Sequence, residues 1–225
     1  MLTGSRVRSN DMGRARPLAT LVVLAAFAAP PQAGSAPGFT ASVATVTAAQ
    51  LRYSYRAGCP VAPGGLRLVR LAFWGFDRRR HLGSIVVNAS VVSSVERVFA
   101  RLYASRFPIR TMEPVDAFRG SDDRSMAADN TSGFNCRAAV TTGPKAWSAH
   151  AYGEAIDVDP LENPYVLGSQ LLPPAGRGYL DRGRVRPGMA EPDGALARAF
   201  ASVGWPWGGR WTGSPDYQHF SSTGG

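Results

Sequence analysis

The sequence contains little that would indicate a membrane-spanning, lipid-anchored or nucleic-acid-binding protein. The apolar run at residues 18–29 is shorter than the roughly 20 residues that a transmembrane helix needs. No cysteine follows this run, which excludes a bacterial lipoprotein anchor. There is no basic helix with interleaved aromatic residues, so a nucleic-acid partner is not expected.

The first 36 residues have the order of a secretory signal. Arginines come first, the apolar run follows, and a stretch rich in proline and small residues comes next. This order is typical of a signal peptide, with cleavage expected between Ala29 and Ala36. The alternative is that the segment remains as an uncleaved anchor. We therefore expect an exported protein, with no stable membrane span once the signal is removed.

Basic residues outnumber acidic ones, 25 against 16, which gives a formal net charge of +9. Part of this excess lies in residues 1–36, and the remainder of the chain is still positive. A positive surface favours anionic surroundings such as acidic wall polymers. Simple solubility is the alternative explanation.

Only two cysteines occur, Cys59 and Cys136. An even number of cysteines in an exported chain suggests a disulfide. A bridge between these cysteines would close a loop spanning 77 positions. In the chain-entropy model, closing such a loop stabilises the fold by on the order of 4 kcal/mol. The alternative is that Cys136 is a soft metal ligand.

With 225 residues the chain is expected to form one domain. We divide it into a signal peptide (1–36), an N-terminal segment of the mature chain (37–64) and a domain that spans 65–225. Strands are expected at Leu66–Phe76 and Ser84–Asn88, joined as a hairpin by a polar turn. A further strand is expected near residues 109–118.

Helices are expected in two places. Apolar residues at helical spacing predict a core helix near residues 89–105, capped by Asn88 or Ser90. A short helix is expected at Asp193–Gly204, with Asp193 as its cap and Gly204 just beyond its end. Short strands mixed with few helices indicate an α+β fold. The polar segment 119–137 is expected to be irregular, and long irregular segments are often functional.

The stretch WSAHAYGEAIDVDP, residues 147–160, places His150 and Asp157 seven positions apart with Gly153 between them. Gly153 permits a backbone turn, and the residues around Asp157 favour a strand, so the two side chains can converge. Near the C-terminus, DYQH supplies Asp216 and His219. Two imidazoles and a carboxylate are the protein ligands of a class of catalytic zinc sites. The second carboxylate is then available as a general base.

Each of these residues also has an ordinary structural explanation. A lone histidine is usually a core or surface residue, and this explanation suits His81. Asp157 and Asp216 are alternatively turn or capping residues. Asp159 is as well explained by a structural role as by support of a metal ligand. The tryptophans Trp205, Trp207 and Trp211 are expected in the core and in the wall of a cleft, or alternatively against a bound peptide or glycan.

Both stretches resemble the signatures of peptidase family M15, the zinc D-alanyl-D-alanine carboxypeptidases and dipeptidases of the VanY/VanX type. SAHAYGEAID has the form S-x-H-x-x-G-x-A-x-D, and DYQH stands where the second signature, E/D-x-x-H, is expected. Phage L-alanyl-D-glutamate endopeptidases share both signatures. The resemblance covers roughly residues 65–221 and points to secreted bacterial members that end in D-Y-Q-H-F.

The resemblance implies a role for several residues. It implies one zinc ion bound by His150, Asp157 and His219. Asp216 would be the general base; many members have glutamate there, and aspartate has a shorter reach. Ser148 would help to hold the substrate.

The family also places an arginine near the developing oxyanion, upstream of the first signature. Arg137 is the first candidate for this catalytic role. Arg119, which would otherwise contribute to substrate binding, is the second, and Arg124 is the third. A guanidinium group suits both an oxyanion and a carboxylate.

The resemblance further implies a small α+β domain with a central antiparallel sheet that carries the zinc site, flanked by helices. The function expected is zinc-dependent hydrolysis of peptidoglycan stem peptides, specifically removal of the terminal D-alanine. The protein is expected to be a bacterial monomer that is exported and associated with the cell wall. One alternative is an L-alanyl-D-glutamate-type endopeptidase with the same site. Another is a wall-binding module that has lost catalysis.

Overall fold

The computed structural model describes residues 1–4, 38–141, 143–144 and 146–224. The predicted signal peptide lies almost entirely outside these residues. The described residues from Gly38 onward belong to one compact unit, so residues 38–64 are part of the same unit as the described residues after them. Within the described residues, no helix is both long enough and apolar enough to cross a membrane.

The largest sheet has three antiparallel strands. They are β1 (Ala41–Thr45), β2 (Leu66–Trp74) and β3 (Arg80–Asn88), in the order β1-β2-β3. Strands β2 and β3 form the predicted hairpin, in register from Leu66 opposite Asn88 to Trp74 opposite Arg80. The predicted bounds are wrong, because β2 ends at Trp74 rather than Phe76 and β3 begins at Arg80 rather than Ser84. A short 3-10 helix, η1 (Pro63–Gly65), precedes β2.

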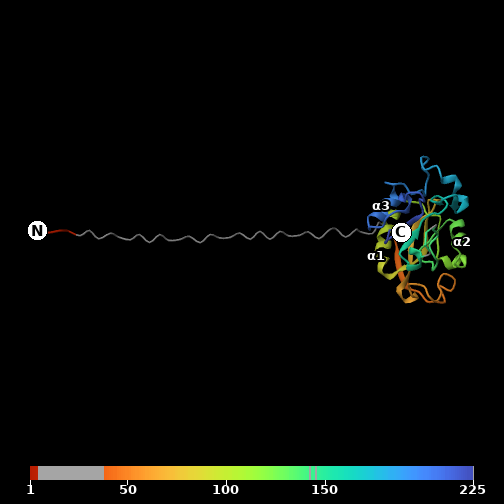
Figure 1. Cartoon of the computed structure of the whole chain (residues 1–225), viewed down its shortest axis with the longest axis horizontal. Helices are drawn as coiled ribbons and strands as arrows, with labels where there is room; N and C mark the ends of the chain where they lie inside the picture. The colour runs from red at the N-terminus through yellow and green to blue at the C-terminus, as the bar shows by residue number, and fades with distance from the viewer. Residues whose placement is uncertain (5–37, 142, 145, 225) are drawn as a thin grey trace. The chain divides into compact units, whose positions relative to one another are not determined.

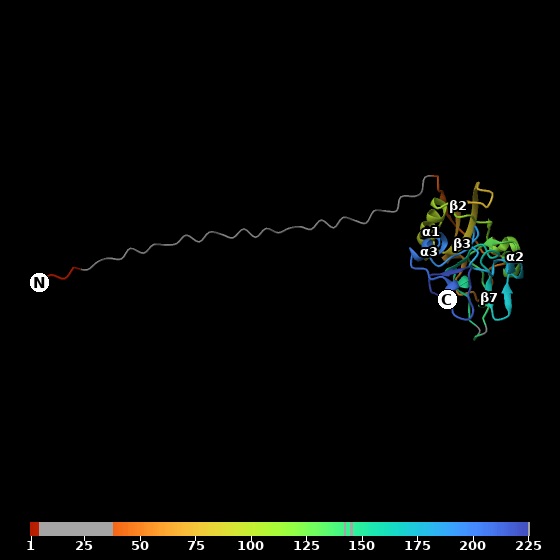
Figure 2. The same cartoon turned by 90° about the horizontal axis from the view of Figure 1, so that it is seen from above.

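Helix α1 (Val92–Ala104) covers one face of this sheet and confirms the predicted core helix. The 3-10 turn η2 (Ala89–Val91) leads into it, and the Asn88 side chain caps that turn by accepting a hydrogen bond from the Ser90 amide. Helix α1 packs against β2 and against α3 (Ala195–Ala201). Figures 1 and 2 show α1 and α3 together on one side of the strands and α2 on the other.

Burial of apolar side chains holds these elements together. Phe99 and Leu102 of α1 are 1% exposed and lie in one cluster with Ile85 of β3 and Phe200 of α3. Each fully buried side chain of this size stabilises the fold by roughly 1.5–3 kcal/mol. The main core therefore lies between the hairpin and the two helices, and it also includes Ile156 of β6 and Phe220 of β9, the chain neighbours of Asp157 and His219.

The predicted cap of α3 is wrong. The helix begins after Gly194, not after Asp193, and no side chain caps it. It also ends earlier than predicted, with Ser202 as its C-cap, although Gly204 does adopt the left-handed backbone, at φ 79°. A side-chain cap is not needed here because packing of Leu196 and Phe200 against the core stabilises the helix.

The polar segment 119–137 is more regular than predicted. It contains α2 (Asp122–Ala127), which is capped by Ser121, and β5 (Asn130–Thr131). Strand β5 pairs in parallel with β4 (Thr111–Met112), which is shorter than the strand predicted there and is followed by the 3-10 helix η3 (Val115–Phe118).

A second, smaller core joins the N-terminal segment to the rest of the domain. Val46 and Leu51 pack there with Leu66, Val86 and Phe134. The predicted disulfide, Cys59–Cys136, is confirmed and lies beside this cluster. Cys136 is therefore not a metal ligand.

The C-terminal half adds short strands that form small sheets of their own. Strand β6 (Ala155–Asp157) pairs with β9 (His219–Ser221), and β7 (Tyr165–Leu167) pairs with β8 (Gln170–Leu172), both antiparallel. The connections contain η4 (Ala149–Tyr152), η5 (Pro174–Tyr179) and η6 (Gly208–Arg210). Helices combined with small antiparallel sheets confirm the α+β class. Asp157 and His219 lie on the β6–β9 pair rather than on the three-stranded sheet, His150 lies in η4, and Asp216 precedes β9.

Candidate metal centre

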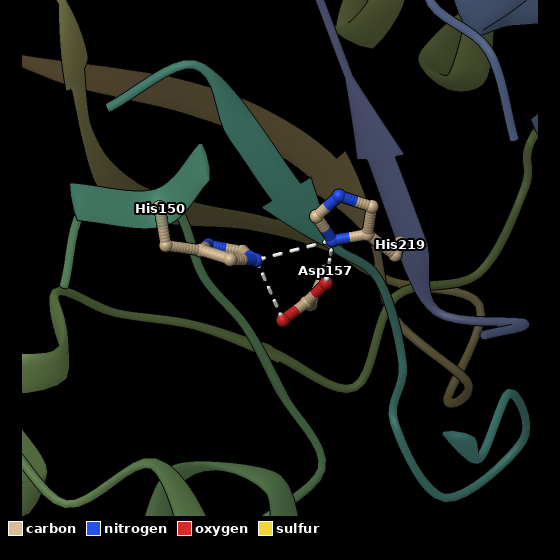
Figure 3. Close-up of side chains that lie close together, drawn as sticks. All are labelled: His150, Asp157 and His219. Carbon is tan, nitrogen blue, oxygen red and sulfur yellow. Dashed lines mark hydrogen bonds and ion pairs between the residues drawn. The ribbon is translucent and has the colours of Figure 1, made fainter. Parts of the chain in front are cut away.

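Strand pairing brings the two signature stretches together. Asp157, the last residue of β6, lies directly opposite His219, the first residue of β9. Directly opposed residues of an antiparallel pair point to the same face of the sheet. His150 approaches that face from η4, and Figure 3 shows the three side chains converging on one point.

The three side chains are buried and in contact. His150 Nε2 lies 3.0 Å from Asp157 Oδ2, and His219 Nδ1 lies 3.1 Å from Asp157 Oδ1. The two imidazole nitrogens are 3.3 Å apart. The potential ligand atoms of the three residues all lie within 4.8 Å of one another, and among the described residues this is the one such group of three.

Local backbone features position His150. The Ser148 side chain caps η4 by accepting a hydrogen bond from the His150 amide. Gly153 ends this turn at φ 69°, and its carbonyl accepts a hydrogen bond from the Asn88 amide at 2.8 Å. A Cβ atom at residue 153 would lie only 2.7 Å from the Asn88 nitrogen. The glycine is therefore required both for the turn and for the close approach to β3.

The hydrogen bonds around His150 direct its Nε2 at the centre of the cluster. Its Nδ1 lies 2.7 Å from the Gly133 carbonyl oxygen, which can only accept, so Nδ1 must carry the proton. A neutral His150 then directs the lone pair of Nε2 at the carboxylate of Asp157. Two acceptors at 3.0 Å repel each other unless a proton or a metal ion lies between them. Bonding of the outer ring nitrogen to a carbonyl is also usual for histidines that bind metals.

The charges within the cluster favour an ionised Asp157. Burial by itself would raise the pKa of this carboxyl group. The charges and hydrogen bonds of His150 and His219 outweigh burial and hold the pKa of Asp157 well below its usual range. An ionised carboxylate and two imidazoles are suitable donors for a divalent metal such as zinc, so the three residues fit the ion that the sequence signatures imply.

Asp216 lies next to this cluster and is buried. Its amide donates to the Gly208 carbonyl, and its Oδ1 has no hydrogen-bond partner among the described residues. Burial and the neighbouring charge of Asp157 raise the pKa of Asp216 to about 7, although His219 and Arg137 act in the opposite direction. A carboxyl group with a near-neutral pKa is suited to exchange protons at physiological pH.

A cavity of about 450 Å³ opens over His150, Asp157 and His219, which could hold a metal ion and are named the metal cluster for that reason. His150, Asp157, His219 and Asp216 contribute to its lining, together with Ser148. Other parts of its wall come from distant segments: Met126 and Asp122 of α2, Tyr165 of β7, Leu172 of β8, Gln218 and Trp211. One side is formed by Ala139, Val140, Thr141, Pro144, Ala146 and Trp147, next to the bridge between Ala138 and Trp147.

Of the three candidate arginines, Arg137 alone is part of this cavity. Its side chain is 21% exposed, and its Nε lies 3.0 Å from Asp122 Oδ1. Arg119 and Arg124 are exposed and do not line the cavity. His81 is exposed on the β2–β3 hairpin, where it pairs with Asp77 at 2.9 Å.

Sequence reasoning missed several residues of the cavity. Asp122 stands in a polar stretch, SDDRS, that gives no indication of a partner 15 positions away at Arg137. Tyr165, Leu172 and Gln218 likewise reach the cavity only through the packing of β7, β8 and β9. The polarity and length of segment 119–137 were the only indication in the sequence that it contributes to the site.

Comparison with known families agrees with this geometry. A family model described as D-alanyl-D-alanine carboxypeptidase, one of the M15 peptidases, matches residues 142–222. Comparisons with curated proteins and with solved structures gave no match. The matched segment contains all three members of the metal cluster and Asp216, and it supports peptidase activity as the general function. The match over residues 142–222 thus confirms the resemblance to peptidase family M15 that the sequence signatures indicate.

Proposed function

We propose that this protein is a zinc-dependent hydrolase of peptidoglycan stem peptides, and specifically a D-alanyl-D-alanine carboxypeptidase. The observation that carries the proposal is the buried cluster of His150, Asp157 and His219 beside Asp216, at the base of a cavity. This combination supplies three metal ligands and a separate carboxylate for proton transfer.

His150, Asp157 and His219 would hold the zinc ion. When bound, zinc polarises a carbonyl group and increases the acidity of water. Ser148 lines the same cavity and is available to contact the substrate backbone. Leu172, Met126 and Trp211 contribute apolar surface to the wall of the same cavity.

Asp216 and Arg137 complete the proposed machinery. Asp216 takes a proton from the attacking water and later delivers it to the amine of the departing D-alanine. The Arg137 guanidinium lies in the same cavity and stabilises negative charge that develops on the carbonyl oxygen. Because Asp122 pairs with Arg137, the arginine is held in place before substrate binds.

The bond that we assign as the one cleaved is the bond between the two terminal D-alanines. A cavity of about 450 Å³ accommodates a D-alanyl-D-alanine terminus and part of the preceding chain. An L-alanyl-D-glutamate-type endopeptidase would use the same metal ligands and base. Export to the cell wall is supported by the disulfide, which persists in oxidising compartments, and by the net positive charge.

Mass spectrometry of pentapeptide stem fragments incubated with the mature protein tests this function. We expect loss of one alanine, abolished by a chelator and restored by zinc. The Asp216→Asn variant should retain zinc but lose activity by a factor on the order of 10²–10⁴. A cut inside the stem would indicate an endopeptidase, and no cleavage by the zinc-loaded protein would favour a binding module.

A further inference from the structure

A second cavity, of about 370 Å³, lies next to the catalytic cavity. The two share one wall residue, Trp211. The second cavity is bounded by apolar and charged side chains, among them Trp205, Trp207, Pro192, Asp193, Arg198 and Arg210. None of the residues assigned above to metal binding or catalysis lines it.

The short helix η6 links this second cavity to the catalytic residues. The Gly208 carbonyl accepts hydrogen bonds from the amides of both Asp216 and Trp211, at 3.0 Å each. The Trp211 ring lies 5.4 Å from the His219 ring, centre to centre. Trp211 therefore lies between the metal cluster and the second cavity, and Arg210 lies at the end of the same short helix.

The charge of this cavity is positive. Arg198 and Arg210 are both exposed, and their guanidinium groups donate to the backbone carbonyls of Asp193 and Pro192. Among the described residues, neither arginine forms an ion pair with a carboxylate. Asp193 is the one acidic residue that lines the cavity, so the two arginines leave an excess of positive charge.

The combination of two arginines with tryptophan and proline walls fits a carboxylate carried on a small apolar body. Building on the proposed function, we propose that the second cavity binds a free carboxylate of the stem peptide on the amino-terminal side of the scissile bond. In such a stem, the second residue, D-glutamate, is joined to the third through its side chain, so its α-carboxylate is free. This residue lies two positions before the D-alanine whose carbonyl is attacked. Two extended residues together with the side chain of the γ-linked glutamate place its α-carboxylate about 10 Å from that carbonyl.

Two synthetic pentapeptides test the inference. Both have the order L-Ala, γ-linked D-Glu, L-Lys, D-Ala, D-Ala, and they differ only in whether the α-carboxyl group of the second residue is free or amidated. Lysine at the third position removes any other carboxylate upstream of the scissile bond. We expect the zinc-loaded mature protein to cleave the free-acid peptide with a kcat/KM about tenfold higher, chiefly through KM. Equal values for the two peptides would overturn the inference.

Arginine variants assign the effect to this cavity. In Arg198→Gln and Arg210→Gln, the ratio of kcat/KM between the two peptides should fall toward one. Arg97→Gln, which changes an exposed arginine of α1 outside the cavity, should retain the wild-type ratio. A ratio that survives in both cavity variants would place carboxylate recognition elsewhere.

A binding measurement separates this inference from the proposed reaction. Calorimetric titration of the zinc-loaded Asp216→Asn protein with the two peptides compares their affinities without turnover. Tighter binding of the free-acid peptide supports the carboxylate site even if the wild-type protein cleaves neither peptide. Absence of cleavage by the wild type would count against the proposed function alone. Equal affinities, or a preference that Arg198→Gln and Arg210→Gln both retain, would overturn the carboxylate site by itself.

Discussion

Asp157 and His219 are directly paired across β6 and β9, with 3.1 Å between Asp157 Oδ1 and His219 Nδ1. Residues 62 positions apart in the sequence are thereby placed opposite each other by the pairing of the two strands. His150 joins them from a turn whose own conformation depends on Ser148 and Gly153. The metal cluster is therefore held by secondary structure and does not depend on flexible loops.

Removal of one ligand should abolish tight metal binding. We expect His219→Ala to lose zinc during dialysis, while the wild type retains about one ion per chain. A ligand that binds only the folded state stabilises it by about 4 kcal/mol at a concentration 1,000 times its Kd. Zinc should therefore raise the Tm of the wild type and leave that of the variant unchanged.

The matched control for this prediction is His81→Ala. His81 is exposed on the hairpin and makes its ion pair with Asp77, outside the cluster. Metal content by atomic absorption and Tm with and without zinc should match the wild type. If His219→Ala retained zinc at the wild-type stoichiometry, the cluster would not be the metal site.

Gly153 should be intolerant of any side chain. Alanine at φ 69° costs about 1–2 kcal/mol by itself, and its Cβ would lie 2.7 Å from the Asn88 nitrogen. We expect Gly153→Ala to lower the free energy of unfolding by about 2 kcal/mol or more and to weaken zinc binding, because the turn carries His150. Urea denaturation and a zinc competition assay measure the two effects. Gly178→Ala is the control, since a Cβ there meets nothing within 4 Å.

The metal cluster follows closely from the sequence, and the cavity around it does not. The seven-residue spacing, Gly153 and the strand-forming residues before Asp157 are local features, so the convergence of His150 and Asp157 could be anticipated. The pairing of β6 with β9 and the assignment of both to a small separate sheet depend on long-range packing. Local patterns do not encode such packing.

The same distinction applies to the fold. The β2–β3 hairpin and helix α1 were predicted because their apolar residues follow strong periodic patterns, and the structure confirms both elements. Helix α2 was missed because its six residues are mostly polar and it is stabilised by the Ser121 cap and by burial of Ser125 and Met126. The cap predicted at Asp193 was wrong because packing, and not capping, fixes the start of α3.

Asp122 should act on catalysis through Arg137, which makes it a positioning residue. Loss of its charge in Asp122→Asn frees the Arg137 guanidinium, whose Nε lies 3.0 Å from Asp122 Oδ1. Because both side chains are partly exposed, the pair contributes little to stability, within about 1 kcal/mol. We expect kcat to fall about three- to tenfold while zinc content and Tm stay near the wild-type values.

Asp123→Asn provides the comparison for this variant. Asp123 is the next residue of α2, is exposed and does not line the cavity. The Asp123→Asn substitution changes the charge of the helix by the same amount as Asp122→Asn but leaves the pair between Asp122 and Arg137 in place. An equal fall of kcat in both variants would show that net charge, and not the pair with Arg137, is responsible.

A buried group of carboxylates near β6 should make stability depend on pH. Glu162 lies beside Asp129, and Asp159 and the hydroxyl of Tyr179 are also nearby. The carboxylate of Glu162 faces Arg110, whose Nη2 lies 3.7 Å from Glu162 Oε1. Arg182 donates a hydrogen bond to the backbone carbonyl of Glu162. Burial, followed by the hydrogen bond and charge of Asp129, raises the pKa of Glu162 from the ordinary 4.5 to about 7, against the effect of Tyr179.

The sign of the effect follows from which state binds more protons. Between pH 4.5 and 7 the folded protein retains a proton on Glu162 that the unfolded chain has lost. The free energy of unfolding should therefore fall as pH rises through this range, by at most about 1.4 kcal/mol per pH unit for one proton. In Glu162→Gln the neutral amide removes this contribution.

Urea denaturation at pH 5, 6, 7 and 8 measures the free energy of unfolding of the wild type and the variant. Plotted against pH, the two sets of values should differ in slope below pH 7 and run parallel above it. Glu96→Gln on α1, outside this carboxylate group, should keep the wild-type slope, and a wild-type slope in Glu162→Gln would show that Glu162 does not hold the proton.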